Sequence, residues 1–272
     1  MKKLLLAGTA LAFGGHALAA DLPLKAPMVA PVPFSWTGCY VGGHVGAGWG
    51  RKDFSDPGFT TAFGTFQNFA PAGSSIADDV QGIAAGGQVG CDYQFANNWV
   101  IGLAGDFSWA NINGQTTDPF FTGKNGNPIT LNAKTNELAT ATARLGYAWD
   151  HFLVYGKGGA AWAHDKYSVQ NLVSFGSPFC FVGTFIACNP TGTETRTGWT
   201  AGAGIEWAFA NNWSALLEFD YYGLGNKSVS LFDPNAGTGG TSGLVNVRQN
   251  IEVLKFGINY HFGWVGPVTA RY

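Results

Sequence analysis

The chain has 272 residues, of which 12% are charged, 15% are aromatic and 40 are glycine, and its formal net charge is -2. A soluble domain usually carries about a quarter charged residues, so this composition predicts a surface that water solvates only in part. The 15 basic and 17 acidic residues are scattered along the chain, which excludes the basic stripe that nucleic-acid binding needs. Apolar residues never form a run of about 18, so any membrane crossing would have to use strands.

The first twenty residues have the organisation of a secretory signal peptide. A positive start, an apolar stretch and a small-residue cleavage site occur at Lys2-Lys3, Leu4–Gly14 and Ala17-Leu18-Ala19. We therefore expect export, with cleavage after Ala19 or Ala20. Residues 21–35 hold four prolines and predict an extended periplasmic linker before the folded part.

Eight stretches of the remaining chain alternate with a period of two between an apolar and a more polar set of side chains. They are residues 39–51, 82–95, 99–110, 136–149, 152–163, 198–208, 213–222 and 248–262. Successive side chains of a strand point to opposite faces, so each stretch predicts a strand with one apolar face. We expect an all-β fold over residues 36–262, an eight-stranded antiparallel up-and-down transmembrane β-barrel.

The connections between these stretches alternate in length. Short turns are expected at Ala96-Asn97-Asn98, Asp150-His151 and Asn211-Asn212, which use residues that tolerate tight turns. Long polar connections are expected at 52–79, 111–135, 164–197 and 223–247. Short periplasmic turns and long extracellular loops are typical of outer-membrane barrels. The repeated FANNW at 95–99 and 209–213 indicates two related hairpins of one sheet.

The tryptophans avoid the middle of the predicted strands. Near the short turns fall Trp36, Trp99, Trp149, Trp207 and Trp213, and near the long loops fall Trp49, Trp109, Trp162 and Trp199. Indole is apolar with one polar edge, so two such groups predict aromatic belts at the two membrane interfaces. A soluble barrel or sandwich with a tryptophan core explains the aromatic content but not this placement.

The less apolar face of the strands carries the charges that we expect to cross the lumen. They are Asp92, Asp106, Arg144, Lys157, Glu206, Glu218, Asp220 and Lys255. The Asp150-His151 turn places Arg144 opposite Lys157, and the next hairpin places Glu206 nearly opposite Glu218. Like charges that face each other are unfavourable, so we expect the two cations to pair with the two carboxylates of the neighbouring hairpin.

An eight-stranded barrel is barely wide enough for its own side chains, so we expect these charges to fill the lumen. A narrow diffusion pore for small solutes, with the same charges as a selectivity ring, is the first alternative. A soluble periplasmic barrel that binds an apolar ligand is the second.

Export permits disulfides, and the mature chain has four cysteines. Cys180 and Cys188 bracket a short segment of a long loop, where a bridge would close a small cap. Cys39 and Cys91 share the apolar face of adjacent strands near the short turns, where a second bridge is a candidate. Neither pair has the close spacing of a structural zinc site, so we expect no metal.

The sequence offers little catalytic machinery. We find no serine elbow, zinc motif or phosphate-cradling loop. Glu218 and Asp220 share one inward face and could do acid and base work in principle, but inward carboxylates beside cations are more often structural. We therefore expect no enzyme activity and no cofactor.

Five segments carry a resemblance to a known family: ALAADLP, SWTGCYVGGHVGAGWG, TARLGYAWDHFLVYGKGGAAW, TGWTAGAGIEWAFANNWSALLEFDYY and LKFGINYHF. They resemble the small porin-like outer-membrane β-barrel proteins of alphaproteobacteria. The resemblance implies an eight-stranded barrel in the outer membrane with a surface-antigen or porin-like role. It also implies that Phe262 is the terminal aromatic read by the insertion machinery, although residues 263–272 follow as a short extension.

The expected partners follow from this interpretation. They are outer-membrane lipid, the barrel insertion machinery and periplasmic chaperones, and nucleic acid is not among them.

Overall fold

The computed structural model describes residues 34–55, 59–61, 64–66, 75–122, 126–173, 187–210, 212–233 and 241–262. Eight long strands form a closed barrel: β1 (Gly38–Ser55), β4 (Ser75–Gln94), β5 (Trp99–Thr122), β6 (Pro128–Trp149), β7 (Phe152–Gln170), β10 (Thr191–Ala210), β11 (Trp213–Asp233) and β12 (Thr241–Phe262). Two short hairpins are separate from it, β2 (Phe59–Thr61) with β3 (Gly64–Phe66) and β8 (Leu172–Val173) with β9 (Ala187–Cys188).

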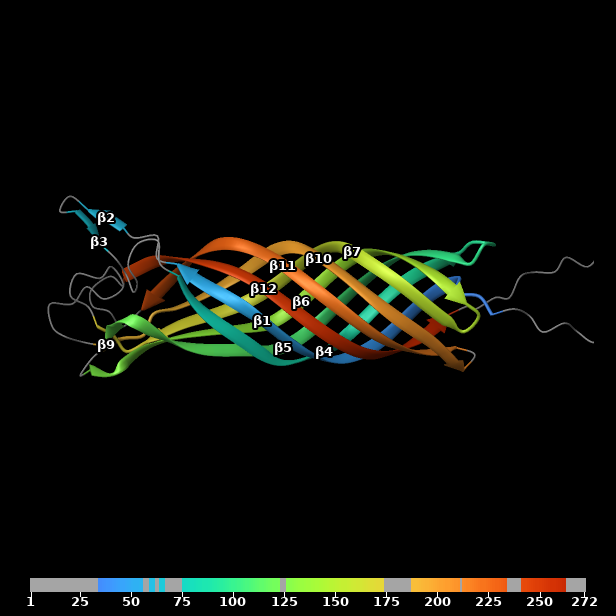
Figure 1. Cartoon of the computed structure of the whole chain (residues 1–272), viewed down its shortest axis with the longest axis horizontal. Helices are drawn as coiled ribbons and strands as arrows, with labels where there is room; N and C mark the ends of the chain where they lie inside the picture. The colour runs from blue at the N-terminus through green and yellow to red at the C-terminus, as the bar shows by residue number, and fades with distance from the viewer. Residues whose placement is uncertain are drawn as a thin grey trace, which may run out of the picture. The chain divides into compact units, whose positions relative to one another are not determined.

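Each long strand pairs antiparallel with its neighbours in chain order, and β1 pairs with β12 to close the ring (Figure 1). The predicted eight-stranded up-and-down barrel is confirmed. Asn98 and Asp150 adopt positive φ angles of 68° and 53° in two of the short turns, a conformation that Asn and Asp tolerate better than other side chains. No helix in the described ranges has the length and apolarity to span a bilayer.

The strands are longer than the sequence predicts, mainly at the long-loop end. For example, β5 continues to Thr122 instead of ending at residue 110, and β6 begins at Pro128 instead of residue 136. Strands therefore occupy much of the predicted long polar connections at 52–79, 111–135, 164–197 and 223–247, and the predicted boundaries of these connections were wrong. The period-two alternation continues through these segments, but here the inward face is apolar and the outward face is polar.

This exchange is visible within a few residues of β5. Before it, Trp109 points outward and is 66% exposed, while Ser108 is buried inside. After it, Asn111 is exposed outside and Ile112 is fully buried inside. The outward face is thus apolar over the part that contacts lipid and polar beyond it, as in a soluble barrel. The long-loop half of the barrel projects into water.

An apolar core fills that projecting half. Its buried side chains come from seven of the eight barrel strands, all except β10, and include Phe54, Val80, Ile112, Leu131, Tyr167, Val229 and Val247. In the membrane-spanning half the same face carries glycine and polar residues, such as His44 and Thr142. Beyond the charged layer, the interior of the barrel is therefore mainly apolar, although it also holds buried charged side chains such as Lys52 and Asp165.

Trp36 departs from the expected belt. It is fully buried and packs with Phe34, Val100, Ala148 and Leu153 at the short-turn end. Its indole N–H donates to the carbonyl of Asp150 at 3.2 Å. Trp36 occupies the interior because it precedes β1 and is not held to the outward face by strand pairing. The other end-of-strand tryptophans are exposed: Trp49, Trp99, Trp109, Trp149, Trp162, Trp199, Trp207 and Trp213.

Candidate functional site

The eight charged residues expected in the lumen all lie there. They come from β4, β5, β6, β7, β10, β11 and β12, and their side chains are at most 8% exposed. Period-two alternation turns them inward, and strand pairing sets their heights. They form two adjoining groups, one around Arg144 and one around two lysines.

Arg144 is the centre of the group nearer the short turns. Its guanidinium binds the carboxylate of Asp92 through two nitrogens, and Nη1 donates to Glu206 at 3.2 Å. The rings of Tyr40 and Tyr155 lie 4.8 and 4.9 Å from its guanidinium carbon. Two carboxylates and two aromatic faces thus replace the water that this buried cation has lost.

Lys157 and Lys255 form the second group with three carboxylates. Lys157 lies 2.7 Å from Glu218 and 3.1 Å from Asp220, and Lys255 lies 2.7 Å from Asp220 and 2.9 Å from Asp106. The predicted partners across hairpins therefore meet, Arg144 with Glu206 and Lys157 with Glu218. Asp106 and Asp220 add contacts that join β5, β7, β11 and β12.

Five carboxylates face three cations in this set, so two negative charges need other partners. Neutral donors supply them. Thr140 donates to Asp106, Tyr155 to Glu218, and Ser214 and Asn259 to Glu206. These contacts extend the network into a hydrogen-bonded layer across the barrel, which is the arrangement that makes buried charge tolerable.

Glycine on the facing strands makes room for these side chains. A Cβ at Gly102 would lie 1.9 Å from Oδ1 of Asp92, and one at Gly202 would lie 2.2 Å from Oδ1 of Asp220. Both positions face the lumen. The glycines of the strands are therefore part of the site, because they open the space into which the carboxylates fold.

Little space remains within the network. A cavity of about 20 Å³ lies among Tyr40, Asp106, Arg144 and Lys157, close to the volume that one water molecule needs. A solute path would have to break ion pairs to pass this level.

A further charged cluster, which the sequence analysis missed, lies inside the projecting half. Lys52 binds Asp165 at 2.9 Å and the hydroxyl of Thr135 at 3.0 Å, and Arg196 lies 3.4 Å from Asp165. Lys52, Asp165 and Arg196 have fully buried side chains. The sequence analysis had assigned all three to long loops. The alternation of Lys52 and Phe54 with Arg51 and Asp53 was the available signal for their inward position.

The cysteines fall into one described and one undescribed pair. Cys39 and Cys91 are register partners on β1 and β4 and form a disulfide on the lipid-facing surface. Cys180 and the side chain of Cys188 lie outside the described residues, as do the signal peptide, nearly all of the proline-rich linker and residues 263–272.

Phe262 ends β12, and its ring packs on Tyr260.

One lumen cluster has the residue types of a catalytic triad but not its geometry. Ser214 Oγ lies 2.8 Å from Nε2 of His261 and donates to Glu206 at 2.5 Å. Glu206 contacts that same Nε2 at 3.3 Å. A proton relay needs the carboxylate and the hydroxyl on opposite ring nitrogens, and all three residues are at most 1% exposed. Among the described residues, no group of His, Cys, Asp and Glu has the arrangement of a metal site.

Known proteins share the fold and much of the sequence. A family model described as outer membrane protein beta-barrel domain matches residues 8–262. A 31 kDa outer-membrane immunogenic protein of Brucella melitensis is 32% identical over 96% of this chain and 100% of its own length. A 25 kDa outer-membrane immunogenic protein of Brucella abortus is 28% identical over 95% and 94%.

A solved structure, the outer membrane protease OmpT from Escherichia coli, matches with a TM-score of 0.49 and 11% identity over 84% of this chain and 98% of that one. A likeness at this level says nothing about activity.

Proposed function

We propose that this protein is a non-enzymatic, non-conducting barrel. The chain belongs to the outer membrane protein beta-barrel domain family and lies in the outer membrane. It acts as a structural and surface-exposed protein of the envelope. The observation that carries this proposal is the layer of ion pairs across the lumen, from Asp92 and Arg144 to Lys157 and Lys255.

Three successive levels of side chains support a closed lumen. Trp36 and its apolar neighbours occupy the short-turn end. The charged layer follows, and the apolar core with Ile112 and Leu131 fills the projecting half. A hydrated pore needs a continuous polar path. In the projecting half most inward side chains are apolar, and Lys52 and Arg196 are paired with Asp165, so this half opposes such a path.

The enclosure of the lumen side chains, which substrate cannot reach, supports the absence of an enzyme activity. A catalytic group has to reach substrate, and the serine, histidine and carboxylate of the lumen cluster are enclosed by the barrel wall. The other described histidines contact Gln88 and Ser108 (His44), Asp150 (His151) and Thr195 (His164), and none of these sets contains a serine, a histidine and a carboxylate together.

Liposome swelling tests the proposal. Proteoliposomes of the purified full-length protein are placed in isotonic solutions of small sugars and amino acids, beside a water-filled porin as positive control. We expect the swelling rate of protein-free liposomes. Swelling that falls with solute size would establish the narrow diffusion pore instead.

A further inference from the structure

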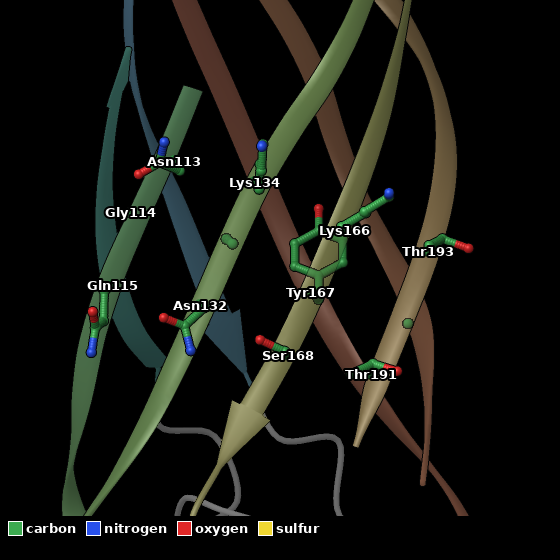
Figure 2. Close-up of a pocket in the computed structure, with 12 residues that line it drawn as sticks. Asn113, Gly114, Gln115, Asn132, Lys134, Lys166, Tyr167, Ser168, Thr191 and Thr193 are labelled. Carbon is green, nitrogen blue, oxygen red and sulfur yellow. The ribbon is translucent and has the colours of Figure 1, made fainter. Parts of the chain in front are cut away.

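The outer surface of the projecting half carries a polar pocket of about 740 Å³ on β5, β6, β7 and β10. Figure 2 shows its lining, with Lys134 and Lys166 on neighbouring strands. Strand pairing builds it from two rows across four strands. One row runs Asn113, Lys134, Lys166, Thr193, and the other runs Gln115, Asn132, Ser168, Thr191.

In the part of the chain that the structure describes, the two lysines of this pocket have no carboxylate partner. They are direct cross-strand partners, and like charges in that position repel. Within the described residues, neither makes an ion pair, whereas two other outward cations do, Arg51 with Asp53 and Lys227 with Glu194. The pocket therefore concentrates positive charge among amide and hydroxyl groups, and an anion bound there would relieve the repulsion.

The pocket lies just beyond the level of the outer tryptophans. On β7, Lys166 follows Trp162 by four positions on the same outward face, which for a tilted strand is about 10 Å along the barrel axis. Figure 2 shows both ammonium groups extending away from the arrowhead of β7, which is toward the membrane end of these strands. Headgroups of the outer leaflet occupy this depth.

We propose that this pocket binds the anionic saccharide headgroup of an outer-leaflet glycolipid. Lys134 and Lys166 bind its phosphate or carboxylate groups, because ammonium groups in a basic pocket attract lipid headgroups. The amides and hydroxyls of Asn113, Asn132 and Thr193 hydrogen-bond to its sugar hydroxyls. The acyl chains of the same molecule then lie against the apolar band below. This inference goes beyond the proposed function and does not require a closed lumen.

Binding of bis-phosphorylated lipid A to the detergent-solubilised full-length barrel, followed by native mass spectrometry, tests the proposal. Lys134→Gln with Lys166→Gln should weaken binding by about tenfold or more. Arg248→Gln is the matched control, because it removes an exposed cation from β12 at the same distance beyond the belt register Trp49–Glu252. It should leave binding unchanged. Equal binding by the double lysine variant and the wild type would overturn the proposal.

Two further measurements test whether the anionic groups are recognised and whether they belong to a lipid headgroup or to free phosphate. Dephosphorylated lipid A should bind more weakly than bis-phosphorylated lipid A, and equal binding would refute anion recognition. Inorganic phosphate should not displace lipid A at equal concentration, and displacement would assign the pocket to free phosphate. Lys134→Arg with Lys166→Arg should retain binding. Heat-shifted mobility in SDS gels verifies that each variant is folded.

Discussion

The ammonium groups of Lys157 and Lys255 contact the same oxygen of Asp220, at 3.1 and 2.7 Å. Lys157 lies on β7 and Lys255 on β12, strands that are not neighbours in the barrel. A carboxylate on β11 thus holds two like charges together across the lumen. The closed interior depends on such shared contacts, so their removal has measurable consequences.

Asp220→Asn keeps the shape of the side chain but removes the shared negative charge. The two lysines then repel each other in a buried site, and we expect the free energy of unfolding to fall by about 3 kcal/mol. Urea unfolding in detergent micelles measures it. Asp53→Asn, which breaks the exposed pair with Arg51, should change it by less than about 1 kcal/mol. Equal effects of the two variants would contradict a stabilising role of the network.

Gly159 and Gly158 are adjacent on β7 but differ in the space around them. A Cβ at Gly159 would lie 2.1 Å from the carbonyl oxygen of Ala141, whereas one at Gly158 would lie 3.6 Å from that of Thr200. Gly159→Ala should destabilise the barrel by about 1 to 3 kcal/mol, because backbone has to move. Gly158→Ala should be neutral or stabilising in the same urea titration. A reversed order would mean that the close approach on β7 does not limit packing.

The exchange of faces along β5 predicts a difference in solvent exposure between two outward positions. A spin label at Leu103→Cys should collide with dissolved oxygen in lipid, and one at Asn111→Cys should collide with a water-soluble nickel complex. Both positions are outward and flank Trp109. If the label at position 111 were shielded from the nickel complex, the projecting half would lie inside the bilayer.

The Cys39–Cys91 disulfide joins two strands that also pair by hydrogen bonds. It closes a sequence separation of 52 residues, for which loop entropy allows up to about 4 kcal/mol of stabilisation. Cys39→Ala with Cys91→Ala should lower the free energy of unfolding by up to this amount and leave the barrel folded. Complete loss of the heat-shifted gel band would show that the bridge is required for folding.

Phe262 at the end of β12 remains a predicted insertion signal. Phe262→Ala should slow assembly by purified insertion machinery into proteoliposomes, with Phe209→Ala, a comparably exposed aromatic at the same end of β10, as control. Assembly at the wild-type rate by Phe262→Ala would assign the signal elsewhere, for example to the residues after it.

Sequence patterning predicts the membrane-spanning half well for a physical reason. Inward residues such as Asp92 and Arg144 differ sharply from outward neighbours such as Leu103 and Leu145, so parity alone separates the two faces. The registers then follow from the short turns, which bring Arg144 opposite Lys157.

The projecting half was not predictable by the same rule, because its inward face is apolar and its outward face polar. Lys52, Asp165 and Arg196 were therefore assigned to loops although they lie deep inside the barrel. Trp36 was assigned to a belt because it sits near a short turn, and nothing in the local pattern shows that it folds into the lumen. Contacts between distant segments, such as Lys52 with Asp165, decide these positions.

Single-channel recording from the purified full-length barrel in planar bilayers tests the closed lumen most directly. With the Arg144, Lys157 and Lys255 ion pairs in place, we predict an electrically silent bilayer after insertion has been verified by gel shift. Stable, ohmic current steps from the wild-type protein, of the size that a water-filled porin gives, would contradict it.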